Sequence, residues 1–504
     1  MRRCNKFWIL LLLVLIMDGF LSVSLAAQGE RLWRMDYGPT WSTPCVVGGR
    51  VFQLNQDEGI ACFRASDGEL LWEQSYPGGG PSSPIYRNGW LYTSCGNVLY
   101  QLDPKTGLAN NSVDVGEYLS SQSPAVSQDK IFVGTFSGIH AFSAQTLVPV
   151  WQVPIGGANF ALANDILYVF ADQLYALNPA NGTEYWHVAS PNGDGFNQGA
   201  INGDYLVAFE KYSWDSGLTQ LVAYDLNDTP TSAPAVLWSS PMGSAYSDNA
   251  PPAMSGDMAF AASREGVLRA FALPGDGTPV WTRPVRGENL APALPIVVGG
   301  NVYIQENSQL VCLDGVTGNL LWTTSETEMG IAWGEPALVD GIVYLATDWT
   351  GLYAFDAGTV EGKWYMMKQN PHVTGSDNGW GPPPIPDIRA NGSDGPISVS
   401  PSDPVSIDIR LYPGNRAGDV ADWWIAVNTP FAPPGDWYSY VYPHGWWPGV
   451  HLCAQAGLFD LAPFEVLNMT LPVGTYNFYF ALDDPDGAAA GPWWGLDSVV
   501  VEVR

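Results

Sequence analysis

Short runs in which hydrophobic and polar positions alternate cover most of the chain, and this period of two is typical of half-buried β-strands. Many runs have a small residue at the centre and a turn directly after them; examples are residues 59–63, 98–103, 174–178, 310–314 and 352–356. Asn-Gly and Asp-Gly pairs stand at 88–89 and 340–341, before further strand-like runs. The pattern predicts an all-β protein built from short strands and tight turns.

Tryptophan recurs at a nearly constant interval in the first three quarters of the chain. The recurring residues are Trp33, Trp72, Trp151, Trp186, Trp238, Trp281, Trp322 and Trp364. They are separated by 39, 79, 35, 52, 43, 41 and 42 residues, and the interval of 79 is a double step with its Trp missing near Asn111. A repeat of about 41 residues indicates a solenoid, a propeller or an array.

Each period contains about four short strands, so the sequence predicts an eight-bladed β-propeller of four-stranded blades. A glycine often precedes the Trp by four residues, as at Gly68, Gly182, Gly277 and Gly318, where a turn with positive φ is expected. Because Trp33 precedes the first complete repeat, we expect the N-terminal strand to complete the last blade and close the ring. An array that stays open is the alternative.

The composition changes after the repeats. We assign residues 30–368 to the propeller, 369–386 to a linker rich in Pro and Gly, and 387–504 to a second domain. In that domain Val405, Ile407, Ile409 and Leu411 alternate with polar residues, as do the apolar residues from Tyr476 to Leu482. About seven such strands predict an immunoglobulin-like antiparallel β-sandwich, and residues 471–476 resemble a tyrosine corner.

The repeated pattern L-Y-A-L-D-x-x-T-G-x-x-x-W, seen at residues 314–322, resembles the pyrroloquinoline-quinone-type propeller repeat. That family includes quinoprotein alcohol dehydrogenases and the propeller lipoprotein of the outer-membrane β-barrel assembly machinery. The resemblance implies that the repeat tryptophans dock between neighbouring blades; these are Trp72, Trp151, Trp186, Trp238, Trp281, Trp322 and Trp364. The C-terminal part resembles an uncharacterised domain of exported bacterial proteins.

Catalytic motifs are missing from the sequence. The resemblance to quinoprotein dehydrogenases would require an adjacent Cys-Cys pair, which the chain lacks, and no Walker loop, G-x-S-x-G elbow or H-E-x-x-H motif occurs. We therefore expect a non-enzymatic protein without a cofactor. A quinone-dependent dehydrogenase is the alternative.

The N-terminal residues and the charge constrain location and partners. Residues 1–27 have basic residues, an apolar run and a small-residue end, which predicts a cleaved signal peptide. We expect an exported protein, periplasmic or extracellular, that neither spans a membrane nor carries a lipid anchor. The net charge of −29, from 50 acidic and 21 basic residues, argues against nucleic acid as a partner. Five Cys follow the signal peptide without a C-x-x-C spacing, so neither a disulfide framework nor a zinc site is predicted.

Two groups of aromatic residues are candidates for partner contact. The fifth repeat is long and its extra residues include Tyr212 and Trp214, while the second domain has an aromatic-rich segment with Trp437, Tyr440, Trp446 and Trp447. A surface insertion and a domain core are the structural alternatives for these groups. The function expected is a binding or scaffold protein with a protein or glycan partner, and the oligomeric state stays open. A carbohydrate-binding or adhesive surface protein is a further alternative.

One acidic turn is a candidate for a metal site. Asp483, Asp484 and Asp486 supply carboxylates in a short turn, and oxygen ligands of this kind suit Ca²⁺. The spacing differs from that of a twelve-residue calcium loop, and a solvated turn is the alternative.

Overall fold

The structure is a computed structural model that describes residues 28–504 with gaps. The longest gaps are 55–58, 77–81, 120–123, 212–217, 227–231, 244–250, 286–293, 359–383, 432–436 and 490–493. The predicted signal peptide therefore lies outside the described residues. Within them, no helix is long and apolar enough to cross a membrane.

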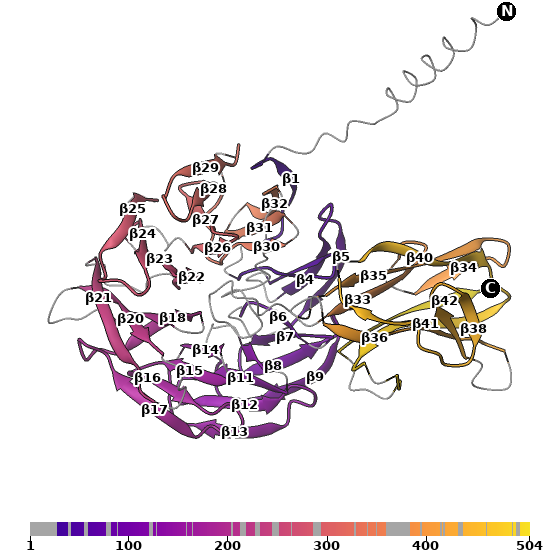
Figure 1. The fold of residues 1–504 in the computed structure, drawn as a ribbon, viewed down its shortest axis with the longest axis horizontal. Coiled ribbons are helices and arrows are strands. Elements are labelled where there is room, and N and C mark those ends of the chain that lie inside the picture. The colour runs from indigo at the N-terminus through magenta and orange to yellow at the C-terminus, as the bar shows by residue number, and fades with distance from the viewer. Residues whose placement is uncertain are drawn as a thin grey trace, which may run out of the picture.

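Eight four-stranded antiparallel sheets form a ring within the described part of the chain (Figure 1). Blade 1 contains β2 (Cys45–Val47), β3 (Arg50–Leu54), β4 (Gly59–Arg64) and β5 (Leu70–Ser75). Blade 2 contains β6 (Ile85–Arg87), β7 (Trp90–Cys95), β8 (Val98–Leu102) and β9 (Ala109–Asp114). Blade 3 contains β10 (Ala125–Val126), β11 (Lys130–Gly134), β12 (Ile139–Ser143) and β13 (Pro149–Val153). Blade 4 contains β14 (Asn159–Ala163), β15 (Ile166–Phe170), β16 (Gln173–Leu177) and β17 (Glu184–Ala189).

The second half of the ring repeats this arrangement. Blade 5 contains β18 (Phe196–Ile201), β19 (Tyr205–Glu210), β20 (Thr219–Asp225) and β21 (Ala235–Gly243). Blade 6 contains β22 (Ala253–Ser255), β23 (Met258–Ser263), β24 (Val267–Ala272) and β25 (Pro279–Pro284). Blade 7 contains β26 (Ile296–Val298), β27 (Asn301–Glu306), β28 (Gln309–Asp314) and β29 (Leu320–Thr323). Blade 8 contains β30 (Ala337–Val339), β31 (Ile342–Thr347), β32 (Gly351–Asp356) and the N-terminal β1 (Arg31–Met35).

The ring closes as the position of Trp33 predicted. Strand β1 pairs with β32, so the two ends of the propeller segment share blade 8. On the inner side, the N–H of Glu335 donates to Oγ1 of Thr43 over 2.9 Å, and the N–H of Thr43 donates to Oγ of Ser83 over 2.8 Å. These hydrogen bonds join blade 8 to blade 1 and blade 1 to blade 2, and full closure removes the edges of the array.

The repeat tryptophans lie at the junctions between blades. Six of the described ones pack on an aromatic residue in the second strand of their own blade, with ring centroids 5.9 Å apart for Phe52 and Trp72 and 6.0 Å for Phe260 and Trp281. Trp238 packs instead on Phe271 of the next blade, with ring centroids 5.2 Å apart. Four indoles donate Nε1–H to a backbone oxygen in a turn of the next blade: Trp33 to Ala65 (2.9 Å), Trp72 to Pro104 (3.0 Å), Trp151 to Pro179 (3.0 Å) and Trp281 to Gly315 (2.8 Å). Trp186 and Trp238 are buried, Trp322 is half-buried, and Trp364 lies outside the described residues.

Blade 2, which lacks the tryptophan, uses a polar substitute. Gln101 occupies the position where blade 1 has Cys62 and blade 3 has Ala141. Its Nε2 donates to the carbonyl of Ala144 in blade 3 over 2.8 Å. Its Oε1 accepts from Nδ2 of Asn110 over 2.8 Å. A side-chain amide thus makes the hydrogen bond to the next blade that an indole makes elsewhere.

The C-terminal part consists of two sheets around a separate core. The first sheet has the order β33 (Ile385–Ala390), β35 (Pro404–Tyr412) and β40 (Leu461–Thr470). The second sheet contains β34 (Ile397–Val399), β42 (Gly495–Val503), β41 (Gly474–Asp483), β36 (Val420–Asn428), β37 (Trp437–Val441) and β38 (Gly445–Pro448), with β39 (Ala454–Gly457) also paired to β36. We call this part the sandwich. Strand β33 begins at Ile385, so it includes the last two residues of the predicted linker.

Both alternating patterns predicted for the sandwich face its core. Val405, Ile407, Ile409 and Leu411 are buried, as are Tyr476, Phe478, Phe480 and Leu482. The Tyr476 hydroxyl donates to the carbonyl of Pro472 over 2.8 Å, which is the contact expected of a tyrosine corner. The sandwich lies beside blades 1 and 2 (Figure 1), and Tyr412 packs against the propeller core.

Candidate functional site

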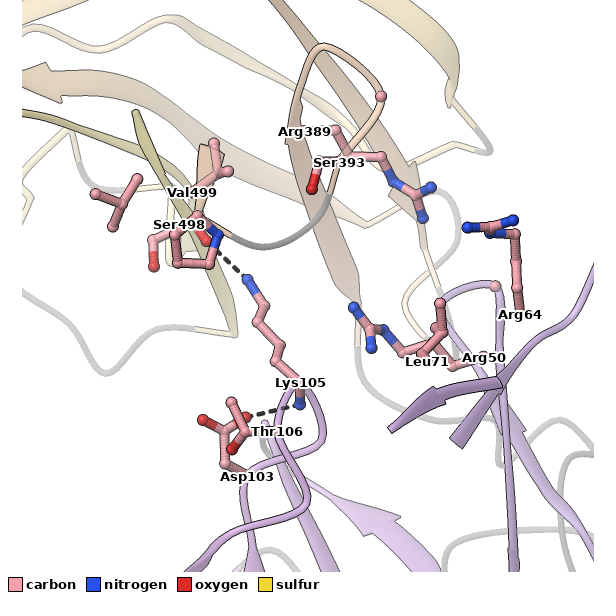
Figure 2. A pocket seen from close by; sticks show the side chains of 14 residues that line it. Arg50, Arg64, Leu71, Asp103, Lys105, Thr106, Arg389, Ser393, Ser498 and Val499 are labelled. Atoms are coloured by element: carbon pink, nitrogen blue, oxygen red, sulfur yellow. Dashed lines mark hydrogen bonds between the residues drawn. The ribbon is translucent and has the colours of Figure 1, made fainter. Parts of the chain in front are cut away.

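A cavity of about 450 Å³ lies between the sandwich and blades 1 and 2. Blade 1 lines it with Gly49 and with Arg50 and Arg64 at the ends of β3 and β4, and the last turn of blade 2 lines it with Asp103, Lys105 and Thr106. On the sandwich side the lining comes from Arg389 in β33, the turn at 392–393 and residues 498–500 of β42 (Figure 2). We call this cavity the interdomain cleft.

The cleft gathers positive charge in an acidic protein. Arg50, Arg64, Lys105 and Arg389 line it, and Asp103 is the acidic residue among the lining residues. The chain has only 21 basic residues against 50 acidic ones. Four basic side chains at one cavity therefore give it a local charge opposite in sign to the net charge of the chain. Charged groups of one sign in a cavity with low-dielectric walls attract counter-ions.

Lys105 connects the two parts of the protein. Its Nζ lies 2.5 Å from Oδ1 of Asp497 and donates to the carbonyl of Ser498 over 2.7 Å. The other oxygen of Asp497 accepts the N–H of Ile388 over 2.8 Å, which ties the carboxylate to the first sandwich sheet. The Asp497 side chain is only 12% exposed, so solvent screens this pair less than an ordinary surface ion pair.

The repeat turn itself positions Lys105. In blade 2 the turn reads Asp103-Pro-Lys-Thr-Gly107, and Oδ1 of Asp103 accepts the N–H of Lys105 over 2.7 Å. The N–H of Gly107 donates to the carbonyl of Asp103 over 2.7 Å, and φ of Gly107 is +70°. A residue without a Cβ adopts this φ without steric cost, so the repeat turn fixes the backbone from which the lysine reaches the sandwich.

Carboxylates outside the lining orient the arginines. Arg389 Nε lies 3.1 and 3.0 Å from the two oxygens of Asp387, and Arg64 Nη1 contacts Asp67 at 2.9 Å and also Glu69. Hydrogen bonds to Asp67 and Glu69 raise the pKa of Arg64 above its ordinary value. Hydrogen bonds from the N–H of Glu69 and from Arg64 lower the pKa of Asp67. These pairs fix the orientation of the Arg64 and Arg389 guanidinium groups.

The predicted aromatic contacts are divided between two faces of the β37–β38 hairpin. Tyr440 and Trp446 pack together on the inner face, and Trp446 Nε1 donates to the carbonyl of Val466 over 2.8 Å. Trp437 lies on the opposite face near Tyr479, with ring centroids 5.5 Å apart, and the cross-strand register puts Trp447 on that face too. Trp447 is 52% exposed. The predicted contacts Tyr212 and Trp214 lie outside the described residues.

The acidic turn is partly described. Asp483 is buried and its Oδ1 accepts Nε1–H of Trp424 over 2.7 Å, whereas Asp484 is exposed and Asp486 lies outside the described residues. Among the side chains that the structure places, no three His, Cys, Asp or Glu residues form a metal-binding group. The calcium site stays a prediction.

A family model matches most of the propeller. The model, described as "Outer membrane protein assembly factor BamB", covers residues 18–166 and 136–365. The chain belongs to this family.

Several proteins with a known name resemble the chain over part of its length. Tetrathionate hydrolase of Acidithiobacillus ferrooxidans is 23% identical over 351 residues, which is 64% of each chain. The outer membrane protein assembly factor BamB of Yersinia pestis is 28% identical over 131 residues, or 25% of this chain and 33% of that protein. The chain thus spans less than two thirds of the length of these relatives.

Solved structures agree on the fold. BamB from Moraxella catarrhalis has a TM-score of 0.52 at 14% identity and covers 64% of this chain and 95% of its own. A quinohemoprotein alcohol dehydrogenase from Pseudomonas putida HK5 has a TM-score of 0.50 at 14% identity, with 65% and 76% covered. At these identities the likeness shows the propeller and nothing of its chemistry.

Sequence reasoning missed the residues of the interdomain cleft. Lys105 stands within a turn that was recognised, at a position where other repeats have Ser66, Gln145 or Val316. A cation at a variable turn position was the available signal. Nothing local marks Asp497 as its partner, because the two residues are almost 400 positions apart.

Proposed function

We propose that the protein is an exported, non-enzymatic binding protein that presents its propeller and its sandwich to a protein partner as one unit. The bridge from Lys105 to Asp497 and Ser498 is the observation that carries this proposal, since it ties the two parts together at a partly buried ion pair. Membership of a family named for an assembly factor supports a protein partner over a glycan.

The surface offered to the partner is the outer face of the β37–β38 hairpin. Trp447 is half exposed there and Trp437 lies beside it on the same face. Large aromatic side chains that bury on contact are the residues most often responsible for binding energy at protein interfaces. Export, as the N-terminal sequence predicts, would bring this face to a partner outside the cytoplasm.

Site-specific photo-crosslinking in the producing cell tests the proposal. A photoreactive amino acid is placed at Trp447 and, as the control, at Val280 on an outer propeller strand; both native side chains are 52% exposed. We expect one discrete crosslinked species from position 447 and none from position 280. The same products from both positions, or none from either, would contradict a docking role for this face.

The enzymatic alternative rests on the relatives named tetrathionate hydrolase. Purified protein incubated with tetrathionate, with heat-inactivated protein as the control, tests it directly. We expect equal tetrathionate consumption in the two samples. Turnover by the native sample alone would refute the non-enzymatic part of the proposal.

A further inference from the structure

The outer strand of each blade is the last strand of its sheet within the part of the chain that the structure describes (Figure 1). Such an edge offers backbone N–H and C=O groups to another chain, and charged residues or proline usually protect it. Strand β29, with the sequence Leu-Leu-Trp-Thr, contains neither a charged residue nor a proline. Every other outer strand contains one: Arg31 in β1, Glu73 in β5, Asp114 in β9, Pro149 in β13, Glu184 in β17, Pro241 in β21 and Arg283 in β25.

Apolar side chains surround this unprotected edge. Leu320 is 47% exposed and Leu321 is 50% exposed, and Val316 in the preceding turn is 69% exposed. The next charged residue along the chain, Glu326, already pairs with Arg31 of β1 over 2.6 Å. The rim of blade 7 is therefore a locally apolar surface on a protein with a net charge of −29.

The hydrogen-bond pattern shows which backbone donors face outward at this edge. The N–H of Thr324, directly after β29, donates to the carbonyl of Leu310 in β28 over 3.0 Å. Successive N–H groups along a strand point to opposite sides, so those of Thr323 and Ser325 point away from β28. Ser325 lies three residues after the repeat tryptophan. Three other blades have proline at this position, and proline leaves no outward donor there: Pro154, Pro241 and Pro284.

The ring already takes one outer strand from a distant part of the chain. Strand β1 pairs antiparallel with β32, the third strand of blade 8, with Trp33 opposite Ala354 and Met35 opposite Leu352. A blade edge of this protein therefore pairs with a strand that no short turn connects to it. This precedent favours an extended segment as the occupant of the β29 edge.

We propose that the outer edge of β29 binds an extended, apolar segment of a protein partner as a fifth strand of blade 7. The N–H groups of Thr323 and Ser325 donate main-chain hydrogen bonds to it, and Leu321 contacts its apolar side chains. A charged segment is disfavoured, because its charges would be buried against leucine. That the segment belongs to a protein partner rests on the proposed function; the contact itself is separate from the β37–β38 hairpin.

Fluorescence anisotropy with a labelled synthetic peptide tests the edge. The probe is a short peptide that alternates valine and threonine between terminal lysines. Its matched control carries an N-methyl group on every valine and threonine amide, so it keeps the charge and loses the backbone donors. We expect saturable binding of the probe to the parent protein and no binding of the methylated peptide.

Variants that protect the edge localise the binding. Leu321→Lys and Ser325→Pro introduce the two kinds of protection found in other blades. Val150→Lys is the control, since Val150 precedes Trp151 as Leu321 precedes Trp322 and is 47% exposed. We expect probe binding to be at least about tenfold weaker in both β29 variants, the loss expected from one hydrogen bond or one apolar contact, and unchanged in Val150→Lys.

Four results would overturn the proposal. The first two are no saturable binding of the probe to the parent and equal binding of the methylated peptide; both need no variant, so they hold whether or not a variant folds. The third is equal weakening by Leu321→Lys and Val150→Lys. The fourth is a dimer of the parent in sedimentation that Ser325→Pro converts to a monomer, which would assign the edge to a second copy. Crosslinking at position 447 does not involve β29, so either proposal can fail alone.

Discussion

The junction between blades 6 and 7 gives a sharp test of how the propeller is held together. Gly318 has φ +72°, and a Cβ added there would lie 2.7 Å from Cδ2 and 2.9 Å from Cε3 of Trp281. Gly300 in the same blade has φ +76°, and a Cβ there would meet nothing within 4 Å. The substitutions Gly318→Ala and Gly300→Ala therefore share the backbone strain and differ in contact with the indole.

The expected loss of stability has two contributions, the backbone strain and the overlap with the Trp281 ring. An L-residue in the left-handed region costs about 1–2 kcal/mol, and this cost applies to both variants. Alanine also stiffens the unfolded chain to a similar extent in both. Overpacking against the half-buried Trp281 ring adds at most about 1–3 kcal/mol, and it applies to Gly318→Ala alone. We expect Gly318→Ala to be less stable than Gly300→Ala by about 1–3 kcal/mol.

Urea unfolding followed by tryptophan fluorescence measures the difference, and Trp281→Ala in both backgrounds completes a double-mutant cycle. The extra cost of Gly318→Ala should disappear when Trp281 is absent, because the overlap is with its ring. Equal urea midpoints for the two glycine variants would refute the account of the blade junction. An extra cost that persists without Trp281 would refute it too.

Three further predictions concern two buried thiols, a buried arginine and the acidic turn at Asp483. Burial raises the pKa of the thiols of Cys45 and Cys312 to about 12 from 9.0, so the folded state favours the protonated thiols. The contribution of these thiols to the free energy of unfolding is complete below pH 9.0 and is lost as pH rises toward 12. The urea midpoint should fall over that range, and at pH 8 a thiol reagent should label the native protein far more slowly than the unfolded one. Arg87 is only 8% exposed. Its Nε and Nη1 have no hydrogen-bond partner among the described residues. Arg87→Met should therefore raise the free energy of unfolding by about 1–3 kcal/mol, and a decrease would indicate an unrecognised partner. Millimolar Ca²⁺ should leave the melting temperature unchanged if the turn at Asp483 is solvated, whereas a saturable rise that Asp484→Asn abolishes would establish a calcium site.

The propeller was predictable because each blade is encoded by a short sequence pattern that recurs along the chain. Tryptophan spacing alone gave the number of blades, and the offset of Trp33 gave the closure through β1. The same reasoning noted the missing tryptophan near Asn111 but could not supply its replacement. Gln101 takes over that hydrogen bond from a different strand, so no residue at the expected position reveals it.

The interdomain cleft was unpredictable for the opposite reason. Its residues come from turns of two blades and from strands β33 and β42, which only the folded chain brings together. Periodicity predicts which strand face is buried, but it does not indicate where a second domain docks on a ring with eightfold repetition. The aromatic hairpin shows the same limit: the sequence located the cluster, and the cross-strand register of β37 and β38 divided it between the two faces.

The central claim is that the Lys105 bridge makes the propeller and the sandwich one unit. Spin labels attached to Val280→Cys in blade 6 and Val473→Cys in the sandwich report the distance between the two parts, since both positions are exposed and the five described native cysteines are buried. The measurement is the width of that distance distribution in the parent and in Lys105→Gln. The account predicts a single narrow distribution that broadens when Lys105 is replaced. A broad distribution in the parent, or an unchanged one in Lys105→Gln, would contradict it.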